Sequence, residues 1–223
     1  MRHFHWSLAL ALAVLAGCAA TPPPYPEDLA SRIALYSSAA PCCEDPAAFA
    51  YAALPGAGTV EFVIGRDSPT FEFQSGASRF AAFRLPDTRE PFKVQVKSFF
   101  DGPRAPDGNV FYPVLAMMDE AFIVTRVSSL ENLRLDQALA TPGGEDGLAV
   151  VAPFDPGYSR ERYLVVFTPA ILLGAPPAER REGDVLTSPT LEWIGRRNEN
   201  IVNPSPFGRL RITVAPASLP DAG

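Results

Sequence analysis

Several short stretches of the chain alternate apolar and polar residues with a period of two. The clearest are residues 60–64, 71–73 and 92–97, where Val, Ile or Phe occupies every second position. Successive side chains of a β-strand point to opposite faces, so this pattern is typical of strands with one face in a core and one against water. Turn residues separate these stretches, as at residues 65–69.

Two longer runs, residues 110–118 and 163–167, are almost wholly apolar and predict strands that are buried on both faces. Pro113 cannot donate a ladder hydrogen bond, so we expect an edge position or a bulge in the first run. The apolar parity also changes between Phe80 and Phe83, which indicates either a bulge or a strand covered on both sides.

Further short runs at residues 122–125, 148–151 and 210–214 bring the expected number of strands to about nine. This succession predicts an all-β fold, a jelly-roll-like antiparallel β-sandwich with one or two short helices. We expect four phenylalanines to lie in its core: Phe71, Phe73, Phe80 and Phe83.

The expected helices are short. Residues 27–36 carry apolar residues at helical spacing, which predicts a short helix packed on the domain. A capping-box pattern, Ser128 followed by Glu131, predicts a helix through Leu139. A Ser-Pro pair predicts the start of another helix over residues 188–197.

The N-terminus has the layout of a secretory signal peptide. A short positive start precedes an apolar run over residues 7–17 that ends in small residues. As a helix this run rises about 16 Å, roughly half of the hydrocarbon thickness, so we do not expect a permanent membrane span. We therefore expect residues 1–17 to be removed.

Cys18 directly follows Leu-Ala-Gly, and this arrangement resembles the bacterial lipoprotein signal. The resemblance implies that Cys18 is the first mature residue and carries lipid, such as palmitate, on its sulfur and its amine. Each buried methylene contributes about 0.8 kcal/mol, so several acyl chains anchor a domain firmly. Ala19, in place of an Asp, favours the outer membrane, with the protein facing the periplasm. An ordinary secreted signal cleaved before a cysteine is the alternative.

These signals divide the chain into four parts. Residues 1–17 form the signal peptide, and residues 18–41, rich in proline, form an extended lipidated linker. Residues 42–216 form one sandwich domain, and residues 217–223 form a tail.

Histidine and charge exclude several function classes. Both histidines, His3 and His5, lie in the signal peptide, so the mature chain can contain no Ser-His-Asp or Cys-His catalytic set and no histidine zinc site. Removing Arg2 leaves 18 basic and 25 acidic residues, a formal charge of −7. This charge disfavours nucleic acid and anionic lipid headgroups as partners, so contact with the membrane depends on the lipid.

The remaining cysteines, Cys42 and Cys43, are adjacent. Their Cα atoms lie about 3.8 Å apart across a trans peptide, below the usual disulfide range of roughly 4.4–6.8 Å. In an oxidising periplasm three states are open: a vicinal disulfide, bonds to a second chain, and reduced thiols. Two cysteines alone do not make a zinc site, and the scattered Asp101, Asp107 and Asn109 lack EF-hand spacing, so we expect no metal and no cofactor.

Several segments, in order and spacing, resemble the maltose operon periplasmic protein family, MalM. They begin at Cys42-Cys43 and continue through residues 68–86, 110–119, 162–168 and 205–210. The resemblance implies an envelope protein associated with uptake of carbohydrates of the maltose and maltodextrin type, without an established enzymatic activity. It supplies no catalytic residues.

We therefore expect a non-enzymatic, lipid-anchored accessory protein that binds a glycan or an envelope partner. Trp193, with Arg196 and Arg197, supplies the aromatic and planar polar groups that sugar contact requires. The competing interpretation is that Trp193 packs the long connection of residues 169–206 onto the sandwich. A structural outer-membrane lipoprotein without a sugar ligand is the alternative function.

A glycoside hydrolase is the remaining alternative, because its two carboxylates need no histidine. Asp119 and Glu120 are adjacent in sequence, so on a strand their side chains point to opposite faces. Asp101 and Asp107 lie in a turn rich in Gly and Pro and are interpreted as solvated loop acids. We therefore expect no enzymatic activity.

Overall fold

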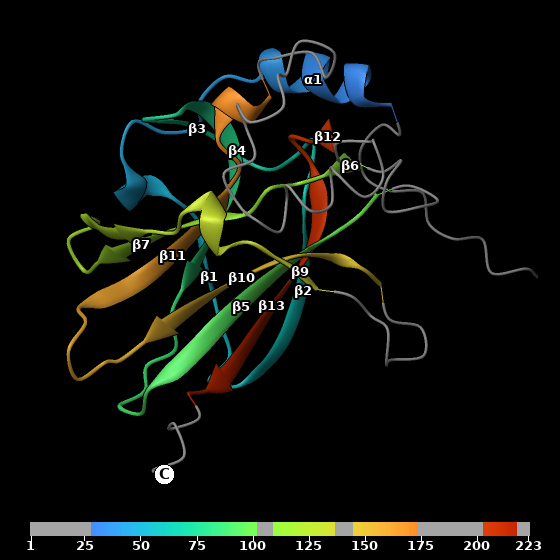
Figure 1. The fold of residues 1–223 in the computed structure, drawn as a ribbon. Coiled ribbons are helices and arrows are strands. Elements are labelled where there is room, and N and C mark those ends of the chain that lie inside the picture. Colours follow the sequence, from blue (N-terminus) through green and yellow to red (C-terminus); the bar gives the residue numbers. More distant parts are fainter. Residues whose placement is uncertain (1–27, 102–108, 137–144, 174–202, 218–223) are drawn as a thin grey trace, which may run out of the picture.

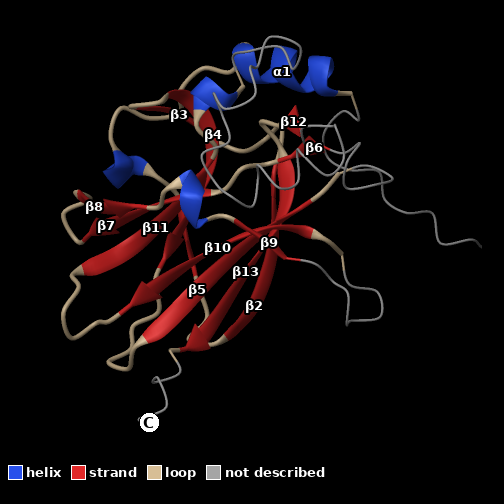
Figure 2. Cartoon of the chain, viewed as in Figure 1, coloured by secondary structure: helices blue, strands red, loops and turns tan. Residues whose placement is uncertain are grey.

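The computed structural model describes residues 28–101, 109–136, 145–173 and 203–217. Two β-sheets pack face to face, and helix α1 (Leu29–Ser37) lies across one end of them (Figure 1). Strands greatly outnumber helices in the described residues, as Figure 2 shows. The expected all-β sandwich with a short helix near residues 27–36 is therefore confirmed.

The first sheet, called sheet A here, contains in spatial order β1 (Tyr51–Ala53), β4 (Gly76–Arg84), β11 (Glu161–Phe167), β7 (Val114–Asp119) and β8 (Val124–Val127), with β3 (Thr70–Phe73) also pairing with β4. Sheet B contains β2 (Gly58–Ile64), β13 (Gly208–Pro216), β5 (Phe92–Phe99), β10 (Gly147–Phe154) and β9 (Arg134–Asp136). A short pair joins β6 (Asn109–Val110) to β12 (Asn203–Pro204). Single 3₁₀ turns lie at η1 (Pro46–Ala48), η3 (Leu130–Asn132) and η4 (Ala170–Leu172).

Pairing within both sheets is antiparallel except between β1 and β4, and the small β6–β12 pair is also parallel. The inner faces of the two sheets enclose the main core, which includes Phe83, Val94, Val96, Leu164 and Leu210. The alternation of residues 92–97 therefore has the expected cause, since Val94 and Val96 are buried while the polar residues that alternate with them, Lys93, Gln95 and Lys97, lie on the other face.

The central strands of sheet A, β4, β11 and β7, are covered on both faces. Phe83 belongs to the main core, whereas Phe80 belongs to a second apolar cluster on the outer face. Strand β4 runs unbroken through both residues, so the parity change reflects a doubly covered strand and not a bulge. Phe71 and Phe73 are only half-buried against the outer cluster, so the core prediction holds for Phe80 and Phe83 alone.

The run of residues 110–118 is buried throughout, as its composition predicts, but it is not one strand. Strand β6 ends at Val110 and β7 begins at Val114, with irregular backbone between them. Pro113 stands immediately before β7, where a missing backbone donor costs no ladder bond.

The prediction of a helix over residues 128–139 is wrong. The cap is Ser129, whose side chain accepts from the backbone of Glu131 and which forms a capping box with Asn132. Only the 3₁₀ turn η3 follows, because Leu133 and Leu135 alternate with polar residues and direct the chain into strand β9. The period of two outweighs the local cap signal. The helix expected over residues 188–197 lies outside the described residues.

Helix α1 belongs to the folded domain, although residues 18–41 were expected to form an extended linker. Asp28 caps the helix by accepting from the Ser31 N–H at 2.7 Å, and this hydrogen bond lowers the pKa of Asp28. Arg32 is 1% exposed, donates to Ser205 at 3.2 Å and forms an ion pair with Asp101. Asp101 is therefore a structural partner of Arg32, which corrects its interpretation as a solvated loop acid.

Candidate functional site

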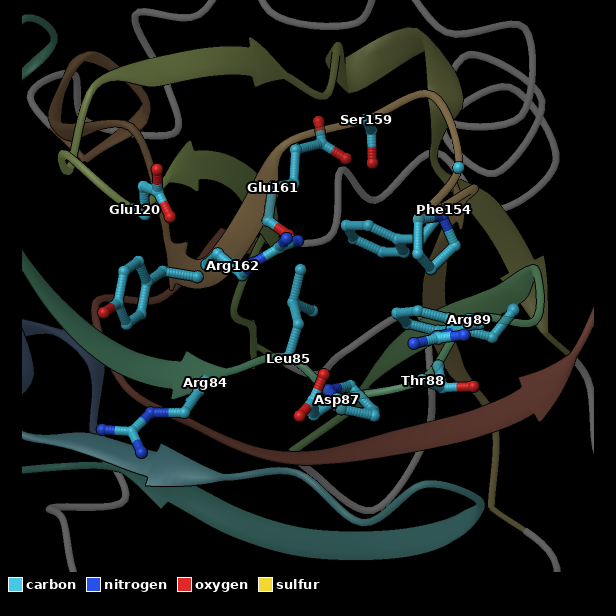
Figure 3. Close-up of a pocket in the computed structure, with 15 residues that line it drawn as sticks. Arg84, Leu85, Asp87, Thr88, Arg89, Glu120, Phe154, Ser159, Glu161 and Arg162 are labelled. Atoms are coloured by element: carbon cyan, nitrogen blue, oxygen red, sulfur yellow. The ribbon is translucent and has the colours of Figure 1, made fainter.

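A cavity of about 810 Å³ opens at the end of the sandwich opposite α1, and we call it the end cavity. Its wall combines the end of β4 with the loop that leads to β5, the turn between β7 and β8, and the turn between β10 and β11. Figure 3 shows side chains from these segments around one hollow. The polar and aromatic residues that line it include Arg84, Asp87, Arg89, Glu120, Ser159, Arg162 and Tyr163.

Backbone hydrogen bonds fix the loops that form the wall. The N–H of Leu85 donates to the carbonyl of Arg162 at 2.9 Å and so ties the β4–β5 loop to β11. In the β10–β11 turn, Asp155 accepts at its carbonyl from Ser159 at 2.8 Å and at its side chain from Gly157 at 3.0 Å. These bonds hold the polar side chains of both loops at one end of the sheets.

The floor of the end cavity is apolar. Phe92 and Phe154 stack with their ring centroids 5.0 Å apart and their planes within 10° of each other. Arg126 lies over the Phe154 ring, with its guanidinium carbon 5.4 Å from the centroid. Both rings are buried in the core, so they support the polar wall and do not offer a face to a ligand.

One of the acidic residues in the cavity wall is fully engaged in structural hydrogen bonds. Glu161 is 8% exposed and accepts from Arg126 at both carboxylate oxygens, at 3.1 and 3.0 Å. Thr125 adds a third hydrogen bond at 3.2 Å. A carboxylate held in this way by a bidentate guanidinium is a structural anchor that joins β8 to β11.

The other charged groups of the wall are exposed. Within the described ranges, no ion pair or hydrogen bond engages the side chains of Arg84, Arg89, Asp87 or Glu120. Guanidinium and carboxylate groups are planar and can form two hydrogen bonds with neighbouring hydroxyls. The wall therefore presents donors and acceptors of the kind that a polyhydroxylated ligand uses.

An aromatic row begins at the rim of the end cavity and continues over the outer face of sheet A. Tyr163 lies 4.4 Å from Tyr51 and 4.7 Å from Phe122, measured between ring centroids. All three rings are half-buried, so each presents part of its surface to solvent. Rings with an accessible apolar surface beside polar groups are suited to stacking against sugars.

A tight turn places Phe122 in this row. Asp119 accepts at its side chain from Ala121 at 2.9 Å and from Ile123 at 3.0 Å, and its carbonyl accepts from Phe122 at 3.1 Å. Phe122 has a φ of 61°, in the left-handed region that side chains other than glycine rarely adopt. The hydrogen bonds of Asp119 stabilise this conformation and give that acid a structural role.

Tyr51 is protonated in the folded protein. Burial raises the pKa of its hydroxyl, and the neighbouring Tyr163 and Asp45 raise it further. The hydroxyl donates to the carbonyl of Pro46 at 2.8 Å, which orients the ring. Tyr51 therefore contributes an uncharged aromatic surface.

A second concavity of about 460 Å³ lies on the outer face of sheet A, and we call it the outer groove. Its lining is mainly apolar and comes from β3, β7, β8 and β11 together with η1 and η3. Phe71 and Phe73, which the sequence pattern assigned to the core, form part of this lining and retain exposed surface.

Of the site residues expected from the sequence, the structure describes only the cysteine pair. Cys18, Trp193, Arg196 and Arg197 lie outside the described residues. Cys42 and Cys43 are joined by a disulfide in the structure, and Cys43 packs against the outer apolar cluster.

Sequence reasoning missed the end cavity because its residues are scattered along the chain. Arg84, Arg162 and Tyr163 meet only because Tyr163 pairs with Arg84 across β4 and β11. The one available signal was that charged residues cluster at the ends of the predicted strands. Among the described residues, no group of three His, Cys, Asp or Glu side chains is arranged to hold a metal ion. No described helix is both long enough and apolar enough to span a bilayer.

Residues 75–174 match the model of a family described as maltose operon periplasmic protein precursor (MalM). The match covers just under half of the chain, from β4 to η4, and confirms the resemblance over these residues. Every residue that lines the end cavity falls within it. The description places members of the family in the periplasm and associates them with the maltose operon. A search of curated proteins gave no match.

Proposed function

We propose, on the premise that residues 75–174 are similar to the maltose operon periplasmic protein family, that this protein is a non-enzymatic accessory of carbohydrate transport. It is anchored through lipid on Cys18 to the outer membrane, faces the periplasm and binds a maltodextrin-type glycan in the end cavity. The observation that carries the proposal is the end cavity itself, where exposed guanidinium and carboxylate groups lie beside the half-exposed ring of Tyr163.

The chemistry of the end cavity supports binding in preference to bond cleavage. A glycosidase needs two carboxylates that act together, one as an acid and one as a base or nucleophile. Glu161 is held by Arg126, and Asp119 is held in its turn, so neither is available for such a pair. The other two acids of the wall, Asp87 and Glu120, are both exposed, whereas the acid of a glycosidase is typically in a buried, apolar environment. A cavity of about 810 Å³ lies within the usual range for small-ligand sites, roughly 300–1,000 Å³.

Calorimetry against maltotriose and maltoheptaose tests the proposal. We expect saturable heat with the intact chain and weaker affinity for Arg89→Ala, because a hydrogen bond to a charged group contributes about 1.5–3 kcal/mol. The matched control is Arg66→Ala. Arg66 is also an exposed arginine, and it follows β2 at the end of sheet B away from the cavity.

The proposal predicts unchanged affinity for Arg66→Ala and at least about a tenfold loss for Arg89→Ala. Absence of heat with either maltodextrin would contradict glycan binding and favour the structural lipoprotein. Equal losses in both variants would show that binding, where present, is not located in the end cavity.

A further inference from the structure

Helix α1 and the end cavity lie at opposite ends of the sandwich, and strands of both sheets run between them (Figure 1). Strand β4 reaches the end cavity at Arg84, and near its other end the carbonyl of Ala77 accepts a hydrogen bond from the Tyr36 hydroxyl of α1. Seven steps along a strand, from Ala77 to Arg84, measure about 23 Å. The helix is therefore separated from the cavity by almost the full length of the sheet.

Strand β5 makes the same connection in the other sheet. Phe92 lines the end cavity, and the strand runs from it to Phe99. Asp101, two residues later, forms the ion pair with Arg32 of α1. Because both sheets hold the helix, α1 has a fixed position at the end of the domain that is farthest from the cavity.

The position of α1 limits the length of chain between the domain and the proposed lipid on Cys18. We call the chain from Cys18 to Asp28 the tether, and ten residues span at most about 36 Å. If α1 were not docked and the free chain ran to Cys42, the corresponding limit would be about 86 Å. Docking of α1 thus shortens the reach by more than half.

We propose that docked α1 holds the domain upright on the membrane, with the end cavity facing away from the bilayer, and that the cavity takes its glycan from the periplasmic solution. This orientation rests on the proposed function, because it requires the lipid on Cys18 and the glycan in the end cavity. A sugar that leaves a pore in the same membrane then reaches the cavity only through solution.

The inverted orientation, with the cavity against the bilayer, requires a tether stretched close to its limit. The strands place about 23 Å, and the thickness of the helix about 10 Å, between the membrane and the start of α1. Together these lengths approach the maximal reach of the tether, about 36 Å. A fully stretched chain has lost its conformational freedom, so this orientation is disfavoured.

The other alternative is a domain that lies on its side. Removal of the expected signal peptide leaves a formal charge of −7, and anionic headgroups repel such a domain. The repulsion acts over about 8 Å at physiological ionic strength, so it is smallest when the least protein surface lies near the bilayer. An upright domain brings only its α1 end that close.

The test uses the lipidated full chain on vesicles of phosphatidylethanolamine and phosphatidylglycerol. A donor dye is attached to one introduced cysteine at a time: Ala34→Cys on α1, Val151→Cys half-way along β10, or Tyr158→Cys in the β10–β11 turn. All three positions are exposed. Cys42 and Cys43 are joined in a disulfide and do not take the dye. Energy transfer to an acceptor on the lipid headgroups measures the height of each dye above the bilayer.

We expect the height to increase in the order Ala34, Val151, Tyr158, with at least about 20 Å between the first and the last. Equal heights indicate a domain on its side, and the reverse order indicates an inverted domain. Either result overturns the proposal.

Release of the helix tests the role of α1. In Arg32→Ala the longer free chain should raise the dye at Val151 and reduce the difference between Val151 and Tyr158, whereas Ala30→Ser should leave both heights unchanged. Unchanged heights in a folded Arg32→Ala protein would overturn the role of α1. If this variant does not fold, the order of the three heights in the otherwise unaltered chain still decides the orientation.

Maltoheptaose coupled to albumin tests access to the cavity. We expect its affinity for the vesicle-bound protein and for soluble Cys18→Ser to agree within about twofold, and at least about a tenfold weaker binding on vesicles overturns the proposal. Failure of the wild type to associate with vesicles contradicts the lipid anchor and the orientation together. Absence of maltodextrin heat with the expected order of heights contradicts glycan binding alone.

Discussion

Tyr51 shows how a single ring depends on its surroundings. Its hydroxyl has a pKa raised by burial and by the neighbouring Tyr163 and Asp45, so the folded state holds this proton more tightly than the unfolded chain. The resulting stabilisation is fully present below the unfolded pKa of about 10 and is lost as the pH rises through the folded pKa. We expect the free energy of unfolding to fall above pH 10 and to fall less in Tyr51→Phe. Urea unfolding across this pH range measures the difference.

A spectrophotometric titration of tyrosine supplies the control. Tyr51→Phe should remove the part of the absorbance change that appears well above pH 10, because the pKa of Tyr51 is raised. Tyr36 also has a raised pKa, from burial and from Glu72, so some absorbance change at high pH should remain. Loss of absorbance near pH 10 in Tyr51→Phe would contradict the buried environment assigned to Tyr51.

At the scale of elements, helix α1 depends on Arg32 for its attachment. Arg32 is almost fully buried and bridges the helix to Asp101 and Ser205. Removing one partner of a buried pair costs roughly 3–5 kcal/mol, and the lower end applies because Asp101 is partly exposed and can be hydrated. We expect Arg32→Ala to lower the free energy of unfolding by about 3 kcal/mol. It should also make α1 sensitive to limited proteolysis.

The matched substitution is Ala30→Ser, on an exposed position of the same helix, which should change stability by less than about 0.5 kcal/mol. Comparable losses in both variants would mean that helix propensity, and not the Arg32 bridge, holds α1. Unchanged proteolysis of Arg32→Ala would mean that other contacts are sufficient to hold the helix.

At the scale of the whole molecule, the sequence predicts which strand faces are buried better than it predicts which distant residues come into contact. Alternation at residues 92–97 correctly predicts β5, because one face meets the core and the other meets water. At Phe80 and Phe83 the same pattern was compatible with either a bulge or a strand covered on both sides. Only the assembled sheet shows that both sides of β4 are covered. The end cavity required the pairing of Arg84 with Tyr163, and the bridge from Arg32 to Asp101 spans 69 positions. Local patterns contain no information on such contacts.

The location of the whole molecule is the last testable point. Removal of the expected signal peptide would leave a formal charge of −7 and no net electrostatic attraction to anionic lipids, so the proposed anchoring would depend on acyl chains at Cys18. Each methylene contributes about 0.8 kcal/mol, and several chains are needed for a stable anchor. We expect the wild type to fractionate with outer membranes and Cys18→Ser to appear in the soluble periplasmic fraction with unchanged maltodextrin affinity. Membrane association of Cys18→Ser, together with no acyl adduct on the wild type by mass spectrometry, would contradict lipid anchoring and leave glycan binding to be judged separately.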